Sequence, residues 1–144
     1  MKSLRHSMLF LLALLATAPI HAESTLPNDS DKNGWHQLSD LFAECSAVYN
    51  VAAKLKNAPA QGNSSYRELA DNALIAGMHS TTRAGLDENY LESTYSAKFN
   101  LWQESSKDKA QAAKLFTKAD QCLKDSLSLQ NQLVGALRGH TAHQ

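Results

Sequence analysis

The sequence contains no apolar run long enough to cross a lipid bilayer as a helix. The longest run covers residues 8–20, whereas a membrane-spanning helix needs roughly 18 or more apolar residues. This run follows Lys2 and Arg5 and ends near Ala22, which is the order of regions in a secretory signal peptide. We therefore predict that residues 1–22 are removed by cleavage near Ala22. The mature chain would then lie in the bacterial periplasm or outside the cell, without a membrane span.

The chain also has no excess charge of either sign. It contains 14 basic and 14 acidic residues, and loss of residues 1–22 removes Lys2 and Arg5 but no acidic residue, which gives a mature net charge of −2. Nucleic-acid-binding domains usually carry an excess of Lys and Arg, so we expect no nucleic-acid partner. The roughly 120 remaining residues suffice for one domain with one core.

The motifs of common catalytic and cofactor sites are missing as well. The sequence has no Cys-x-x-Cys or Cys-x-x-Cys-His pair, no Gly-x-Ser-x-Gly nucleophile turn and no glycine-rich phosphate loop. We therefore predict no enzyme activity and no cofactor. An active site assembled in space from scattered residues is the alternative that these absences leave open.

The histidines add no metal or haem site to this interpretation. His140 and His143 lie in a terminal tail, where ordering two ligands costs conformational entropy. Met78 and His79 are neighbours in the sequence, so they cannot reach a haem from opposite sides. We expect Met78 to pack inward and His79 to lie near the surface, and we predict no metal ligands.

Strands are not expected, because runs of alternating β-branched residues are absent. Apolar residues recur instead at three- and four-residue steps, which is the period of amphipathic helices. The pattern predicts helices over residues 35–56, 65–85, 87–104 and 107–138. The second of these helices carries small residues, including Gly77, on its inner face, which would let a neighbouring helix approach closely.

The segments outside the helices are polar. Residues 23–34 are predicted to form a flexible leader, and residues 139–144 a flexible tail after the stop at Gly139. The helical domain would therefore cover residues 35–138.

Capping residues set the predicted helix ends. Ser65 with Glu68 forms a capping box, Gly85 suits the left-handed position after a helix, and Asp87 is a candidate cap for the third helix.

The boundary between the third and fourth helices is open. Ser105 with Asp108 matches a second capping box, which predicts a turn, but one continuous kinked helix also fits the pattern.

The only two cysteines, Cys45 and Cys122, lie on or beside the apolar faces of the first and last predicted helices. In an oxidising compartment such a pair usually forms a structural disulfide, which would contribute about 4 kcal/mol by restricting the unfolded chain. A redox or metal-binding pair, and two free cysteines in a chain that is not exported, are the alternatives. We predict the bond, and with it an all-α, four-helix bundle-like domain with one inter-helix disulfide.

Aromatic residues gather on the third predicted helix, which carries Tyr90, Tyr95, Phe99 and Trp102, while Trp35 begins the first. These side chains most simply fill the core. If the third helix has more apolar surface than its neighbours can cover, the excess would form an exposed patch and a protein interface. The five aromatic residues are therefore both core candidates and interface candidates.

The Glu44-Cys45 pair followed by Tyr49, the alanine-rich middle helices and Cys122 late in the chain resemble small exported all-helical proteins of proteobacteria, mostly uncharacterised. The resemblance implies a helical periplasmic protein and carries over no catalytic or ligand residues.

We accordingly expect a module that binds another periplasmic or envelope protein through one helical face, such as an inhibitor, an immunity protein or an envelope-stress accessory. The alternative is a carrier that holds a small molecule or metal between its helices.

Overall fold

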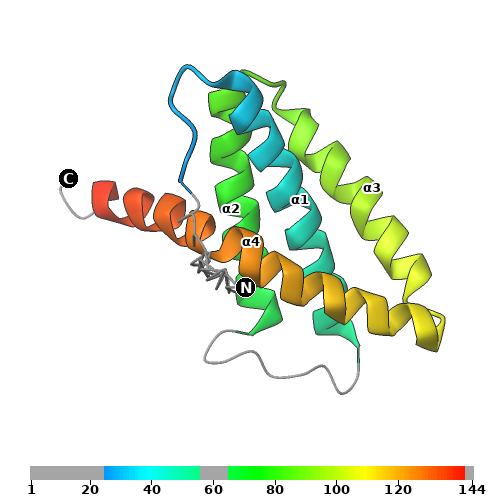
Figure 1. Cartoon of the computed structure of the whole chain (residues 1–144). Coiled ribbons are helices and arrows are strands. Elements are labelled where there is room, and N and C mark those ends of the chain that lie inside the picture. Colours follow the sequence, from blue (N-terminus) through cyan, green and yellow to red (C-terminus); the bar gives the residue numbers. More distant parts are fainter. Residues whose placement is uncertain (1–24, 56–64, 142–144) are drawn as a thin grey trace, which may run out of the picture.

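The structure is a computed structural model that describes residues 25–55 and 65–141, without the side chains of residues 140 and 141. The predicted signal peptide, residues 1–22, and His143 lie outside these residues. The described part is all-helical and contains no strand, as predicted. Its four helices fall on the four predicted segments: α1 (Lys32–Lys54), α2 (Tyr66–Ala84), α3 (Asn89–Ser105) and α4 (Lys109–Thr141) (Figure 1).

The ends of α2 follow from local residue chemistry. The Ser65 hydroxyl accepts a hydrogen bond of 3.2 Å from the backbone N–H of Glu68, which satisfies one of the free donors at the start of the helix. Gly85 ends the helix with a φ of 70°, a conformation that glycine adopts without a steric cost. The predicted Ser65 cap and the predicted end at Gly85 are confirmed.

The third and fourth helices are separate, and the residue that begins α4 differs from the prediction. The Asp108 carboxylate accepts hydrogen bonds from the backbone N–H groups of Ala110 and Gln111, at 2.8 and 3.2 Å. Asp108 therefore caps α4 in place of Ser105, which belongs to the last turn of α3. The predicted stop at Gly139 is wrong, because α4 continues through that residue.

The described part of the predicted flexible leader is ordered against the helices. α1 begins at Lys32 and not at Trp35, because the Asp31 carboxylate accepts a hydrogen bond from a backbone N–H in the first turn. The indole N–H of Trp35 donates to the carbonyl of Asn28 at 2.9 Å. The predicted helix start at Trp35 is therefore wrong, because residues 32–34 of the predicted leader belong to α1.

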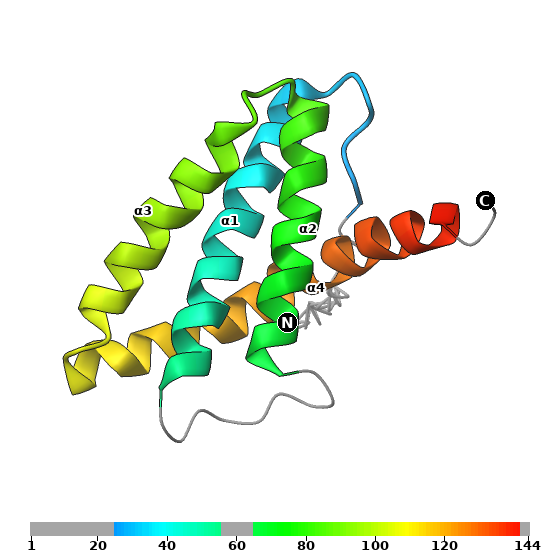
Figure 2. The same cartoon turned by 180° about the vertical axis from the view of Figure 1, so that it is seen from behind.

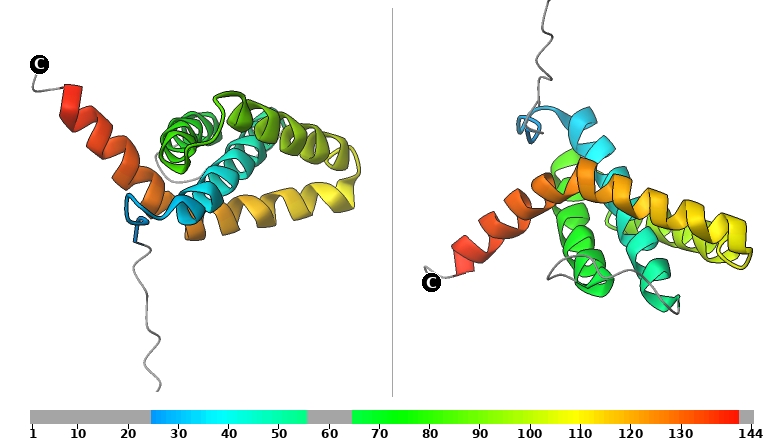
Figure 3. Two further views of the ribbon diagram at one scale, coloured as in Figure 1. Left: turned by 90° about the horizontal axis from the view of Figure 1, so that it is seen from above. Right: turned by 60° about the horizontal axis from the view of Figure 1, so that its bottom comes forward.

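α1 is the central helix of the fold. Twelve of its 23 residues are buried, and α2 and α3 flank it (Figure 1). α4 crosses α1 and α2 obliquely, in front of them in Figure 1 and behind them in Figure 2. Its C-terminal end extends beyond the other helices (Figure 3). The fold is thus three roughly aligned helices crossed by a fourth, and the face turned to the viewer in Figure 2 is the one that α4 does not cross.

The predicted disulfide is present in the core. Cys45 on α1 and Cys122 on α4 are bonded, with their Cα atoms 5.6 Å apart and 77 positions between them in the sequence. Both residues are fully buried among Val48, Tyr49 and Leu115. The bond fixes α4 where it crosses α1, so the crossed arrangement has a covalent link at its centre.

Candidate functional site

α2 and α3 approach each other closely at one point. Gly77 on α2 has no side chain, and a Cβ atom placed on it would lie 2.9 Å from Cδ1 of Leu91 and 3.4 Å from Cβ of Phe42. Leu91 is the only residue of α3 that is buried. The small residue predicted to admit a neighbouring helix therefore admits the leucine side chain that anchors α3 beside α2.

The rest of α3 is held by α1 and not by α2. The hydroxyl of Tyr90 donates to the Asp40 carboxylate at 2.6 Å and, because it is the donor there, accepts from Nε2–H of His36 at 2.7 Å. One turn further on, the side-chain amide of Asn50 donates to the hydroxyl of Tyr95 at 2.9 Å. These contacts draw α3 toward α1 and leave a space between α2 and α3.

This space is a groove of about 270 Å³ with two walls, which we call the α2–α3 groove. Its lining comes from α2, from α3 and from Glu88 directly before α3, and includes no residue of α1 or α4. The lining residues are Leu74, Met78, Glu88, Leu91, Glu92 and Tyr95.

Met78 is the most exposed apolar residue of the groove. Its exposed fraction is 57%, and Ile75, one turn earlier on α2, is 39% exposed. The prediction that Met78 packs inward is therefore wrong. Its neighbour Gly77 occupies the inner position instead, and α3 lies too far from α2 to cover the methionine. His79 is partly buried.

The charged residues of the groove are both acidic. Glu88 and Glu92 lie one turn apart at the start of α3, where the positive end of the helix dipole favours carboxylates. No basic side chain lines the groove, and within the described part of the chain neither carboxylate belongs to an ion pair. The groove therefore presents apolar side chains beside two uncompensated negative charges.

The predicted interface residues lie in different environments in the structure. Trp35 is 1% exposed, because the segment before α1 covers it and the Arg83 guanidinium lies 4.8 Å from its ring centroid. The interface prediction is therefore wrong for Trp35. Phe99 and Trp102 are partly buried against the core around the disulfide. Tyr95 lines the groove, where its ring stacks on Phe99 with the centroids 5.8 Å apart.

Tyr90 is part of a polar contact between helices. Its hydrogen bond to Asp40 raises the pKa of the phenol above its usual value of 10, because the neutral form is the donor. The half-exposed cluster of Tyr90, Asp40 and His36 holds the start of α3 against α1. No described groove adjoins the cluster, so we assign it a structural role.

Five lining residues of the groove were not identified as site residues from the sequence: Leu74, Met78, Glu88, Leu91 and Glu92. The sequence contained one sign of the groove. Leu74, Ile75 and Met78 extend the apolar face of α2 beyond the small residues that face the core. The acidic pair of α3 gave no signal of its own, since carboxylates are common in the first turn of helices.

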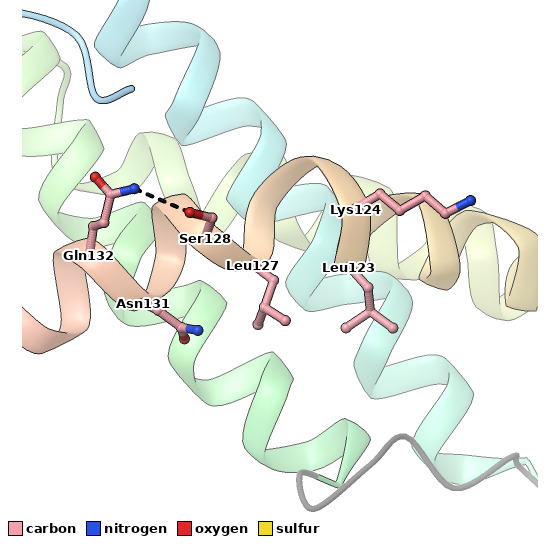
Figure 4. A pocket seen from close by; sticks show the side chains of 6 residues that line it. All are labelled: Leu123, Lys124, Leu127, Ser128, Asn131 and Gln132. Atoms are coloured by element: carbon pink, nitrogen blue, oxygen red, sulfur yellow. Dashed lines mark hydrogen bonds between the residues drawn. The ribbon is translucent and has the colours of Figure 1, made fainter. Parts of the chain in front are cut away.

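A second hollow, of about 640 Å³, runs along α4. Leu123 and Leu127 point to the same side of the helix, and the Gln132 amide donates to the Ser128 hydroxyl at 3.3 Å (Figure 4). All its lining residues belong to this one helix. The hollow is thus an open helix face without a second described wall, and the α2–α3 groove is the better candidate site.

Across residues 25–55 and 65–141, no group of three or more His, Cys, Asp or Glu side chains is placed to hold a metal ion. No helix in these ranges combines the length and apolarity needed to span a bilayer.

Comparisons with known proteins found no matching family model, no similar curated protein and no similar solved structure.

Proposed function

We propose that this protein is an exported protein-binding module that receives a helical segment of a partner in the α2–α3 groove. The observation that carries the proposal is the exposed Met78, which lines the groove with Leu74 on the α2 side and with Leu91 and Tyr95 on the α3 side. An amphipathic helix that lies in an apolar groove is a common mode of peptide recognition. The unbranched methionine side chain can adapt to the shape of what it contacts.

The energetics favour an occupant at this position. Complete burial of a methionine side chain is worth about 1.5 to 3 kcal/mol relative to exposure. Met78 is a little more than half exposed, so covering it would contribute about 1 kcal/mol.

The compartment belongs to the same proposal. The Cys45–Cys122 disulfide is typical of proteins in oxidising compartments, and the basic, apolar and small-residue regions of residues 1–22 are those of an export signal. The partner would then be a periplasmic or envelope protein. The module would act by occluding the partner's helix, as an inhibitor or an immunity protein does. The carrier alternative has less support, because both hollows are open to solvent.

Site-specific photo-crosslinking tests the proposal. A photoreactive amino acid replaces Ile75, an exposed residue one turn before Met78 on α2, and in a second strain it replaces Ala113 on the exposed side of α4. We expect a discrete adduct from position 75 in cells of the native organism and none from position 113.

The groove itself is tested by Met78→Glu in the same chain, which should abolish the adduct because a carboxylate would enter the apolar surface. Circular dichroism of the purified variant checks that it is folded. Equal adducts from the two positions, or an adduct at position 75 that persists with Met78→Glu, would contradict the assignment.

A further inference from the structure

We infer that the occupant of the α2–α3 groove is a basic amphipathic helix with two Lys or Arg residues four positions apart, an inference that rests on the function proposed above. The observations that carry it are the two carboxylates in a wall without basic side chains, and the apolar residues beside them.

The spacing of the carboxylates defines the spacing of the charges on the partner. Glu88 and Glu92 are four residues apart at the start of α3, and four residues correspond to a rise of about 6 Å along a helix. Two basic residues four apart on a helix lying along the groove have the same separation. Each would face one carboxylate while the adjoining apolar face covers Met78 and Leu74.

The surroundings add to the acidic character of the groove. Asp71 lies one turn before Ile75 on the exposed face of α2, and Arg67 lies one turn further away. Asp87 precedes α3, where its carboxylate accepts a hydrogen bond of 2.8 Å from the N–H of Asn89. A neutral or acidic helix would cover the same apolar residues but leave Glu88 and Glu92 without a counter-charge.

Three synthetic peptides of about 18 residues, roughly five helical turns, test the inference. They share one apolar face of Leu and Ala and differ only at two positions four apart, which carry Lys and Lys, Gln and Gln, or Glu and Glu. Binding to the oxidised mature chain is measured by fluorescence anisotropy of a dye on the peptide. We expect the Lys peptide to bind about five- to tenfold more tightly than the Gln peptide, the gain expected from two exposed ion pairs. This advantage should fall as salt is added.

Substitutions in the protein locate the effect. The double variant Glu88→Gln/Glu92→Gln should remove the preference for the Lys peptide and leave binding of the Gln peptide unchanged. The matched control is Asp120→Asn/Asp125→Asn on the exposed side of α4, which changes the net charge equally and should preserve the preference. Met78→Glu should weaken binding of the Gln peptide.

The outcomes separate this inference from the proposed function. Equal binding of the three peptides, with a loss on Met78→Glu, would overturn the inference about charge and leave the groove as a helix-binding site. No binding of any peptide, or binding that Met78→Glu leaves unchanged, would overturn both. Self-association of the mature chain in analytical ultracentrifugation that Met78→Glu abolishes would assign the groove to a second copy of this protein and overturn the inference.

Discussion

The contact between Gly77 and Leu91 can be tested quantitatively by adding one methyl group to α2. Replacement of a helical glycine by alanine usually stabilises a protein by about 1 kcal/mol, because alanine loses less backbone entropy on folding. At Gly77 the new methyl group would lie 2.9 Å from Cδ1 of Leu91, and overpacking of this kind commonly costs about 1 to 3 kcal/mol. We therefore expect Gly77→Ala to leave the free energy of unfolding unchanged or to lower it by up to about 2 kcal/mol.

The expected sign changes when Leu91 is shortened. In a Leu91→Ala background the next contact of the new methyl group is Cβ of Phe42 at 3.4 Å, which is close to ordinary van der Waals contact. Gly77→Ala should then give the full gain of about 1 kcal/mol. The coupling free energy between the two positions should accordingly be about 1 to 3 kcal/mol in favour of the double variant.

Urea denaturation of the oxidised proteins, followed by circular dichroism, measures all four members of this cycle. Gly135→Ala on α4 is the matched control, because a Cβ atom there meets nothing within 4 Å. It should stabilise both the wild-type and the Leu91→Ala backgrounds equally. A gain of about 1 kcal/mol from Gly77→Ala in the wild-type background would show that Leu91 does not lie against the α2 backbone, and would refute the geometry of the groove.

Three further predictions concern the core and the start of the chain. The oxidised protein, denatured without reductant, should show no reactive thiol, and two thiols per chain before reduction would disprove the bond. Reduction of the Cys45–Cys122 bond should lower the free energy of unfolding by about 4 kcal/mol. Burial raises the pKa of the Tyr49 phenol from 10 to about 12, so the folded state holds the phenol proton more tightly than the unfolded state does. The stability that this proton contributes is complete below pH 10 and should be lost as the pH rises toward 12. Urea unfolding at pH 9 and pH 11 measures this loss, which Tyr49→Phe should reduce; an unchanged loss would contradict the assignment. Arg83→Gln removes both an ion pair with the segment before α1 and the cation–π contact with Trp35. The substitution should shift the tryptophan fluorescence to longer wavelength and lower the free energy of unfolding by less than about 1 kcal/mol. An unshifted spectrum would show that the segment before α1 shields the indole without the arginine.

The features that could be predicted from the sequence are those with local causes. The periodicity of apolar residues gave the four helices, and Ser65 and Gly85 gave the ends of α2, because the caps depend only on neighbouring residues. The disulfide was predicted from the oxidising compartment that the predicted export signal would imply. The cap of α4 was misassigned because Ser105 and Asp108 are both good capping residues, and only the end of α3 decides between them.

The candidate site could not be predicted in the same way, because it depends on distances between helices. Whether Met78 is covered depends on how far α3 lies from α2, and that distance follows from Leu91 at Gly77 together with the polar contacts of Tyr90 to α1. Trp35 was both a core candidate and an interface candidate, because the helical periodicity does not decide between the two. Its burial comes from the preceding segment and from Arg83, more than forty positions later in the chain.

The disulfide also divides the molecule into parts of unequal local stability. It joins α1 to α4, while α3 has one buried residue and is otherwise held by half-exposed polar contacts and by the partly buried Phe99 and Trp102. Segments with few buried contacts open more often than the core in native-state hydrogen exchange. The amide protons of α3 should therefore exchange well before those of α1. Transient opening of α3 would widen the groove without unfolding the cross-linked core, so partners with apolar faces of different size could be accommodated by one stable scaffold.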